Sequence, residues 1–168
     1  MSSSPARIKI KQITARINQS LKDAAKAENM IPTAQFAIDT IVKRARLGYG
    51  VAEDEGEKFK FPSLSPSYQK FRSKFHGLSD TTSPSKSNIT LTGQLLDSVQ
   101  IITKRDGEIV MGPAGVRRDG KLSNKTLAGY PADKGRPFMF ISKLEYQQVL
   151  RFYRKTFGDL LDKQGLLR

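Results

Sequence analysis

Few side chains in this sequence have types and spacings that could support catalysis. The single histidine, His76, lies beside Gly77 in a Ser-rich segment, and no Gly-x-Ser-x-Gly element accompanies it, so a Ser/His/Asp triad is not indicated. Asp119 and Lys121 have the acid-x-Lys spacing of common metal-dependent nucleases, but they lie in a Gly-rich turn rather than on a predicted strand. Because an active site needs several convergent titratable groups, we predict that the protein is not an enzyme.

Metal and cofactor sites are not indicated either. The chain has no cysteine and one histidine, which excludes thiolate sites and His-rich metal sites. Residues 53–57 form a short acidic run, Glu-Asp-Glu-Gly-Glu. A calcium loop places oxygen ligands at alternating positions over about 12 residues and ends in Glu, whereas this run has adjacent carboxylates. We therefore expect a solvated loop here, with no metal and no cofactor.

The charge balance is strongly basic. The chain holds 29 Lys and Arg against 16 Asp and Glu, a formal net charge of +13. Such charge favours a polyanionic neighbour, a membrane surface or an acidic protein partner, although solubility alone also accounts for it. There is no run of about 18 apolar residues and no apolar signal segment near the N-terminus, so we expect cytosolic synthesis and no membrane partner. The candidate contacts to DNA or an acidic partner are Lys43, Arg44, Arg46, Arg117, Arg118, Lys121 and Lys125.

Hydrophobic periodicity predicts two N-terminal helices. Apolar residues recur at spacings of three and four over residues 6–29, and Asn29 is a plausible end of this first helix. A second helix is predicted over 32–47, and the cations in its last turn also favour the helix dipole without any ligand. We interpret residues 1–48 as an N-terminal helical arm or hairpin and residues 49–168 as the core. The stripe of the first helix consists of Ile10, Ile13, Ile17 and Leu21.

The segment that follows is predicted to be mostly loop. Residues 49–64 contain the acidic run and are expected to be exposed. Residues 77–88 are rich in Ser, Thr and Pro, which is typical of a loop. Between these loops, Ser65 is a suitable N-cap and Pro66 a suitable first residue for a short helix over 65–75.

A β-hairpin is the clearest strand signal in the chain. The segments 98–103 and 108–111 are rich in β-branched residues, and Asp106-Gly107 between them is typical of a tight turn. Residues 112–135 contain five Gly and two Pro and are predicted to form a long exposed loop.

The C-terminal helix is predicted from its cap and its apolar face. Residues 136–141 are expected to form a short strand or turn, and Ser142 followed by Glu145 forms a capping box for a helix that ends near Lys163. The apolar side chains of this helix are Leu144, Val149, Phe152, Tyr153, Phe157, Leu160 and Leu161. If buried, this broad face contributes roughly 10 kcal/mol before entropy is subtracted. The elements together predict an α+β fold in which a small antiparallel sheet is packed by the long C-terminal helix.

Three short motifs occur in order along the chain. The segment from Phe61 to Lys70 is similar to a Pro-Leu-Ser-Pro-x-Tyr-x-x-x-Lys pattern, and the segment from Leu91 to Val99 is similar to Leu-Thr-Gly-x-Leu-x-x-Ser-Ile. Arg136-Pro-Phe then precedes the C-terminal helix. This order, over roughly residues 36–161, resembles the phage virion morphogenesis family and the related tail-completion, or head–tail joining, families. The motif residues are Pro62, Leu64, Tyr68, Leu91, Thr92, Gly93, Leu95, Leu96, Ser98, Arg136, Pro137 and Phe138.

Each motif also has a physical interpretation as a scaffold. Tyr68 and Phe71 are expected to pack the short helix down, and Thr92 is expected to cap a turn that the following glycine permits. The residue before a proline is extended, so the Arg136 guanidinium can reach a carboxylate or a backbone carbonyl while Phe138 anchors beneath it.

The resemblance implies a structural protein of the tailed-phage virion, assembled in the host cytoplasm. Its place would be the neck, as a tail terminator, tail-completion or head–tail joining protein. Related neck proteins form six-fold rings, so the resemblance implies a homo-oligomer, with a hexamer expected, around the DNA channel. The implied partners are other neck, connector and tail-tube proteins and the passing DNA, which would be contacted through its phosphates. The alternative from another class is a free, non-specific basic DNA-binding protein, although no recognition helix is evident.

Overall fold

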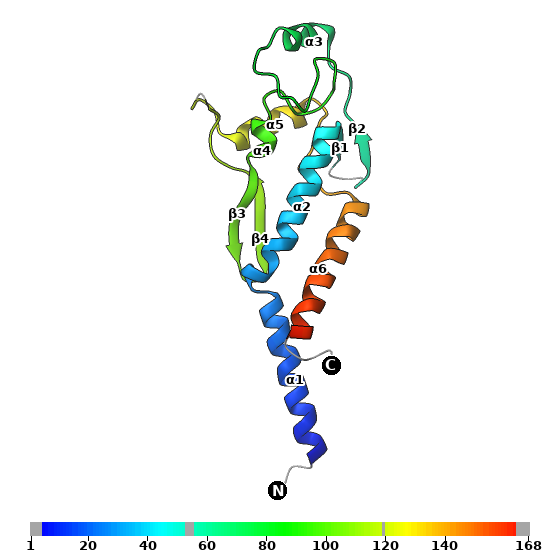
Figure 1. Cartoon of the computed structure of the whole chain (residues 1–168), viewed down its shortest axis with the longest axis vertical. Helices are drawn as coiled ribbons and strands as arrows, with labels where there is room; N and C mark the ends of the chain where they lie inside the picture. Colours follow the sequence, from blue (N-terminus) through cyan, green and yellow to red (C-terminus); the bar gives the residue numbers. More distant parts are fainter. Residues whose placement is uncertain (1–4, 53–55, 119, 164–168) are drawn as a thin grey trace.

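The computed structural model describes residues 5–52, 56–118 and 120–163, with side chains described from residue 14 onward. It confirms the predicted α+β class, in a molecule that is elongated with α1 projecting from one end (Figure 1). No helix among these residues is long and apolar enough to cross a membrane. In chain order the elements are α1 (Pro5–Ala24), α2 (Ala27–Leu47), β1 (Tyr49–Val51), β2 (Lys58–Lys60), α3 (Pro66–Ser73), α4 (Gln94–Asp97), β3 (Val99–Arg105), β4 (Glu108–Pro113), α5 (Asn124–Asp133) and α6 (Lys143–Lys163).

The boundary between the first two helices differs from the prediction. The first helix ends at Ala24 rather than near Asn29, and α2 already begins at Ala27, which leaves the proline at 32 inside the helix. The tip of the β3–β4 hairpin is hydrogen-bonded to the residues at the break between α1 and α2. Asp106 Oδ1 accepts the Ala27 N–H at 3.0 Å, and Gly107 N–H donates to the carbonyl of residue 25 at 2.6 Å. A contact this distant in sequence is invisible to local periodicity.

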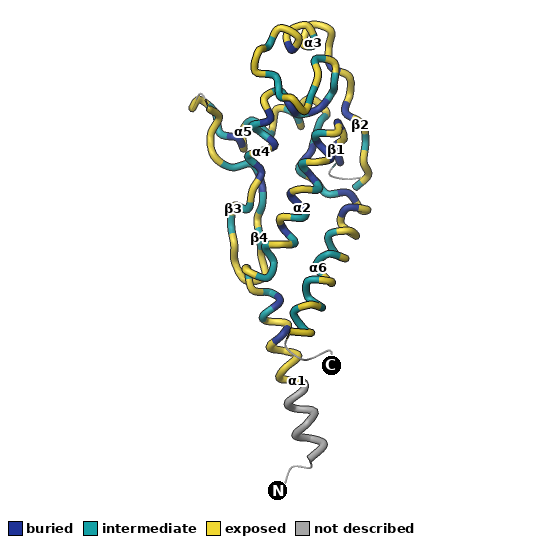
Figure 2. The backbone as a smooth tube through the Cα atoms, in the orientation of Figure 1, coloured by how far each residue is buried: buried dark blue, intermediate teal, exposed yellow. Residues whose placement is uncertain are grey.

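The second helix is the centre of the hydrophobic core. It lies between the β3–β4 hairpin and α6, and it contacts both (Figure 1). The dark blue buried stretches concentrate around its C-terminal half (Figure 2). Thus α2, which the sequence assigned to an N-terminal hairpin, packs as part of the core. The core cluster consists of Ile38, Ile41, Ala45, Phe61, Leu96, Val99 and Phe138.

Among the described residues, two antiparallel strand pairs are present, one more than was predicted. The predicted hairpin is confirmed as β3–β4, paired from Val99↔Pro113 to Arg105↔Glu108. The segment 49–64, predicted as an exposed loop, is not all loop, since β1 pairs with β2 and Val51 is fully buried. Gly50 lies so close to the Pro137 carbonyl that any larger residue would clash there.

The segment 112–135 is also more ordered than predicted. It is not a continuous loop, because it contains the helix α5. The N-cap of α5 is Ser123, whose Oγ accepts the Thr126 N–H at 3.0 Å. Val116 forms an isolated β-bridge with Ser123 and closes the preceding turn. This short helix was not predicted because the segment is rich in Gly and Pro. Residues 136–141 form no strand; the segment is irregular, with a bend at residues 139–140.

The apolar face of α6 is only partly buried. Phe152 stacks on Phe36 of α2 with ring centroids 4.7 Å apart, but the large apolar side chains of α6 are half-buried or exposed, including Leu144 and Tyr146. The fully buried side chain of α6 is Glu145. The estimate of about 10 kcal/mol for complete burial therefore does not apply to the single chain.

Gly158 offers a direct test of α6. It lies inside this helix, and a Cβ added there would meet no atom within 4 Å. Gly158→Ala is expected to raise the free energy of unfolding by about 0.5–1 kcal/mol, because alanine loses less backbone entropy in a helix. Urea denaturation measures this change. Gly107→Ala, at a φ of 81°, is the control and should destabilise the chain; a destabilising Gly158→Ala would mean that α6 is not helical there.

Candidate functional site

The three motifs meet in the folded chain. The Arg136 guanidinium donates to the carbonyls of Pro62 at 3.1 Å and Ser63 at 3.4 Å, so the third motif holds the first. Phe138 is fully buried and joins the core cluster with Leu96 of the second motif. The expectation that Arg136 reaches a backbone carbonyl while Phe138 anchors beneath it is confirmed.

The second motif forms the short helix α4. Gly93 is its N-cap, with a left-handed φ of 84° that favours glycine, and the Thr92 hydroxyl accepts the Gln94 N–H at 3.4 Å. Thr92 was expected to be the N-cap of this turn. The structure instead places Gly93 at the N-cap position. Leu96 is buried under the turn, and Ser98 Oγ donates to the Leu95 carbonyl at 2.7 Å.

The first motif places an aromatic row on the surface. Ser65 Oγ accepts the Tyr68 N–H at 3.3 Å, which confirms the predicted cap of α3. Tyr68, Phe71 and Phe75 then follow one another with ring centroids 5.8 and 5.7 Å apart. The expectation that Tyr68 and Phe71 pack this helix down is wrong, since they are 40% and 50% exposed. Exposed aromatic rows of this kind are typical of protein–protein contact surfaces.

Two grooves flank this row, and we call them the tip grooves. Tyr68 lines both of them. The first, of about 620 Å³, is lined by Pro62, Leu64, Ile89, Tyr130, Pro131 and Arg136 among others. The second, of about 360 Å³, is lined by Phe71, Phe75, Leu91, Leu95, Arg117 and Leu127 among others. Residues from all three motifs thus form the walls of one surface at the α3 end of the molecule (Figure 1).

A buried arginine under α3 holds this surface in place. Arg72 is fully buried and donates to the carbonyls of Lys86 and Thr90, each at 3.0 Å, and to the Thr82 hydroxyl at 2.7 Å. Its guanidinium carbon also lies 6.0 Å from the Tyr68 ring centroid. Burial lowers the pKa of Arg72 from its ordinary value. Sequence analysis missed this role, although the basic position of the first motif, four residues after the tyrosine, falls on Arg72.

A second buried node joins α2 to α6. Arg44 and Glu145 form an ion pair, and their side chains are 4% and 1% exposed. Arg44 also donates to the carbonyls of Phe138 at 2.6 Å and Phe140 at 2.7 Å. The third motif is thereby tied to both helices. Arg44 was predicted as a possible contact to DNA or a partner, and its burial in this node contradicts that prediction.

Glu145 has several further partners. The predicted capping box is confirmed. The Ser142 N–H and hydroxyl donate to Glu145 Oε2 at 3.0 and 2.9 Å, respectively. The Glu145 N–H in turn donates to Ser142 Oγ at 3.2 Å. Lys58 Nζ of β2 lies 3.1 Å from Oε1. Burial raises the pKa of Glu145, but the Ser142 N–H, Arg44 and Lys58 outweigh burial and lower it overall. A carboxylate held ionised by two cations and by the Ser142 donors is suited to positioning rather than to proton transfer.

The other predicted basic contacts lie in two separate places. Lys43 is exposed on α2, while Arg46 nearby is half-buried and paired with Asp97, so its role as a contact stays a prediction. The remaining four are exposed on the loop before α5 and on α5 itself, away from the C-terminal end of α2 (Figure 1). This second group consists of Arg117, Arg118, Lys121 and Lys125.

Within the described ranges, no group of three or more His, Asp or Glu side chains could hold a metal ion. Residues 53–55 of the acidic run lie outside those ranges, so the expectation of a solvated loop there stays a prediction. Comparisons with protein-family models, with curated proteins and with solved structures found no match for this chain.

Proposed function

We propose that this chain is a non-enzymatic structural protein of a tailed-phage virion, located in the neck, where it completes the tail or joins it to the head. The convergence of the three motifs carries this proposal. Segments more than 70 residues apart meet through Arg136 and Pro62, and together they form an exposed surface with an aromatic row. A surface of this composition supports binding of other proteins rather than chemistry on a small substrate.

In this proposal, copies of the chain form a ring, with six as the expected number, around the DNA channel. The surface cations on Lys43 and on the loop before α5 would then neutralise phosphates or face acidic neck and tail-tube proteins. Contacts to phosphates would be independent of sequence and sensitive to salt. Three of these exposed basic residues, Arg117, Arg118 and Lys121, precede α5 and would make such contacts.

Light scattering combined with a DNA mobility-shift assay tests this proposal on the purified chain. A defined oligomer, with a mass that is a multiple of 18.7 kDa and weak DNA binding lost in moderate salt, is expected. Arg117→Glu/Arg118→Glu should weaken that DNA binding, while the oligomer should persist. A monomer that binds DNA tightly would overturn the ring and favour the alternative, a free basic DNA-binding protein.

A further inference from the structure

The two tip grooves adjoin each other along α5. Tyr68 and Ile89 line both of them, so the grooves share a border instead of lying apart on the surface. The side chains that α5 contributes are spaced by three, one and three residues, which places them on one face of the helix. They are Leu127, Tyr130, Pro131 and Lys134. From Leu127 to Lys134 this face rises about 10 Å, which about three residues of extended chain would span.

Both grooves offer apolar positions to a partner. Tyr130 in the first groove and Phe71 in the second are 51% and 50% exposed, so contact with another molecule would remove much of each ring from water. Ile89 and Leu91 in the same walls are half-buried. Exposed rings beside aliphatic side chains suit the apolar side chains of a protein, because aromatic residues are frequent anchors at such contacts.

The charged side chains that line the tip grooves are all basic. Lys134 and Arg136 line the first groove and Arg117 lines the second, and among the described residues neither groove is lined by Asp or Glu. Lys134 and Arg117 are exposed. Because opposite charges attract across an interface and like charges repel, these walls favour an acidic ligand.

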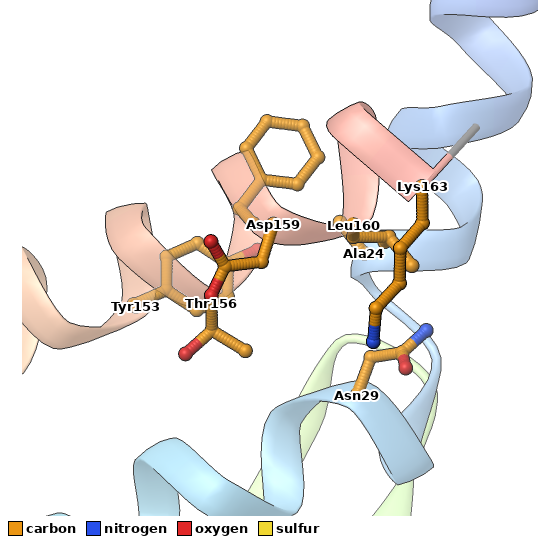
Figure 3. Close-up of a pocket in the computed structure, with 8 residues that line it drawn as sticks. Ala24, Asn29, Tyr153, Thr156, Asp159, Leu160 and Lys163 are labelled. Carbon is orange, nitrogen blue, oxygen red and sulfur yellow. The ribbon is translucent and has the colours of Figure 1, made fainter. Parts of the chain in front are cut away.

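Other concave places on the chain have linings of mixed charge. The crevice of about 170 Å³ between α6 and the start of α2 has Asp159 and Lys163 in its lining (Figure 3). The groove of about 480 Å³ beside the C-terminal half of α2 includes Asp39 with its cations, and the groove of about 700 Å³ between α2 and α6 includes Asp39 and Glu145. The basic lining of the tip grooves is therefore a local property and not a mere consequence of the net charge.

We infer that the tip grooves bind a short acidic segment of another protein, with its apolar side chains in the grooves and its carboxylates beside Lys134 and Arg117. A second copy of the chain is disfavoured as the occupant, because it carries the same net charge of +13. The inference deepens the proposed function by giving the chemistry of the partner, and it rests on that proposal in taking the partner to be a neck or tail protein.

The walls of the grooves fit a peptide better than a nucleic acid. Bases stack on open aromatic faces. The Tyr68 ring, however, already stacks on Phe71 with 17° between the ring planes, and it lies 6.0 Å from the Arg72 guanidinium carbon. Aliphatic walls such as Ile89 add no stacking surface for a base, whereas they bury the apolar side chains of a peptide.

Selection from a displayed library of random peptides of about seven residues tests the inference on the full-length chain. The wild-type chain is expected to enrich peptides that combine Asp or Glu with aromatic or aliphatic residues. Tyr130→Ser/Lys134→Glu should weaken binding of a selected, labelled peptide by at least about ten-fold, because an aromatic contact and a favourable charge are both lost. Fluorescence polarisation measures the binding.

Tyr146→Ser/Lys155→Glu is the matched control. It makes the same two changes at exposed positions of α6 that line neither tip groove, so peptide binding should not change. The circular dichroism spectra of both double variants should match that of the wild type, since all four side chains are exposed. Failure to enrich acidic peptides, or equal peptide binding by the two double variants, would overturn the inference.

Two other occupants would give different results. Single-stranded oligothymidine that displaces the selected peptide and binds more tightly than it would assign the grooves to nucleic acid and overturn the inference. Sedimentation tests the second copy, because Tyr130→Ser/Lys134→Glu should leave the oligomeric state of the wild type unchanged. Loss of an oligomer in this variant, with the oligomer kept in the control, would place another copy in the grooves and overturn the inference.

Experiments in a phage that encodes the chain separate the inference from the proposed function. Acidic peptide binding by a chain that proves dispensable for virion assembly would overturn the proposed function and support the inference. A chain that is required for joined virions, but works equally well as Tyr130→Ser/Lys134→Glu, would support the proposed function and overturn the inference.

Discussion

Replacing Glu145 with glutamine is expected to lower the free energy of unfolding by about 3–5 kcal/mol, because it leaves the buried Arg44 guanidinium without a counter-charge. Glutamine keeps an oxygen that can accept the Ser142 N–H, so the capping box can survive and the loss reports the ion pair. Chemical denaturation monitored by circular dichroism measures the change. Asp159→Asn, an exposed carboxylate on the same helix, should change stability by less than about 0.5 kcal/mol.

The pH dependence of this variant gives a second readout. The pKa of Glu145 lies below its unfolded value of 4.5, so the stability it contributes is present above that pH and is lost as pH falls through the folded pKa. The gap between wild type and Glu145→Gln should therefore narrow as the pH is lowered below 4.5. A gap that stays constant down to the acid transition would contradict an ionised Glu145.

Phe138→Ala is expected to cost a similar amount, about 3–5 kcal/mol, because it leaves a cavity in the middle of the core. Phe138 is 1% exposed and packs with Ile41, Leu96 and the other core residues. Its carbonyl bond from Arg44 is a backbone contact and remains available in the variant. Thermal unfolding provides the measurement.

Phe140 is the matched control for this substitution. It lies two residues further along, its carbonyl also accepts from Arg44, and its side chain is 37% exposed. Phe140→Ala should therefore have a much smaller effect. Equal losses for the two variants would mean that Phe138 is not the anchor of the third motif.

The parts of the fold with local signals could be predicted from the sequence. The Asp106-Gly107 turn, the Ser65 cap and the Ser142–Glu145 capping box all depend on residues within a few positions of one another, and the structure confirms them. The C-terminal helix was likewise predicted from its periodicity, although its degree of burial was not.

The parts that failed depend on contacts distant in the sequence. Val51 pairs with Lys58 of β2, and its N–H is taken up by the distant Pro137 carbonyl at 3.3 Å. The first helix breaks where the tip of the β3–β4 hairpin contacts it. Arg44 looked like a surface cation because its partner Glu145 is 101 residues away. Tyr68 and Phe71 looked like core residues because aromatic side chains at helical spacing serve both cores and interfaces.

The candidate site could likewise be predicted only in part, because some of its features depend on contacts distant in the sequence. The three motifs were predicted to form a scaffold, and the bond from Arg136 to the Pro62 carbonyl confirms that they meet. Their sequences gave no sign of the tip grooves, since a groove depends on how α3 and α5 lie relative to each other. Arg72, which bonds to the Thr90 carbonyl in the loop beneath α3, lies two residues after the Phe61–Lys70 segment and was overlooked because a basic residue on a short helix is usually solvated.

Negative-stain electron microscopy of particles assembled without this protein tests the neck role most directly, in a phage that encodes the chain. Filled heads and separate tails are expected, with joined virions restored when the wild-type chain is supplied in trans but not when Phe138→Ala is supplied. Normal infectious virions in the absence of the protein would contradict the role.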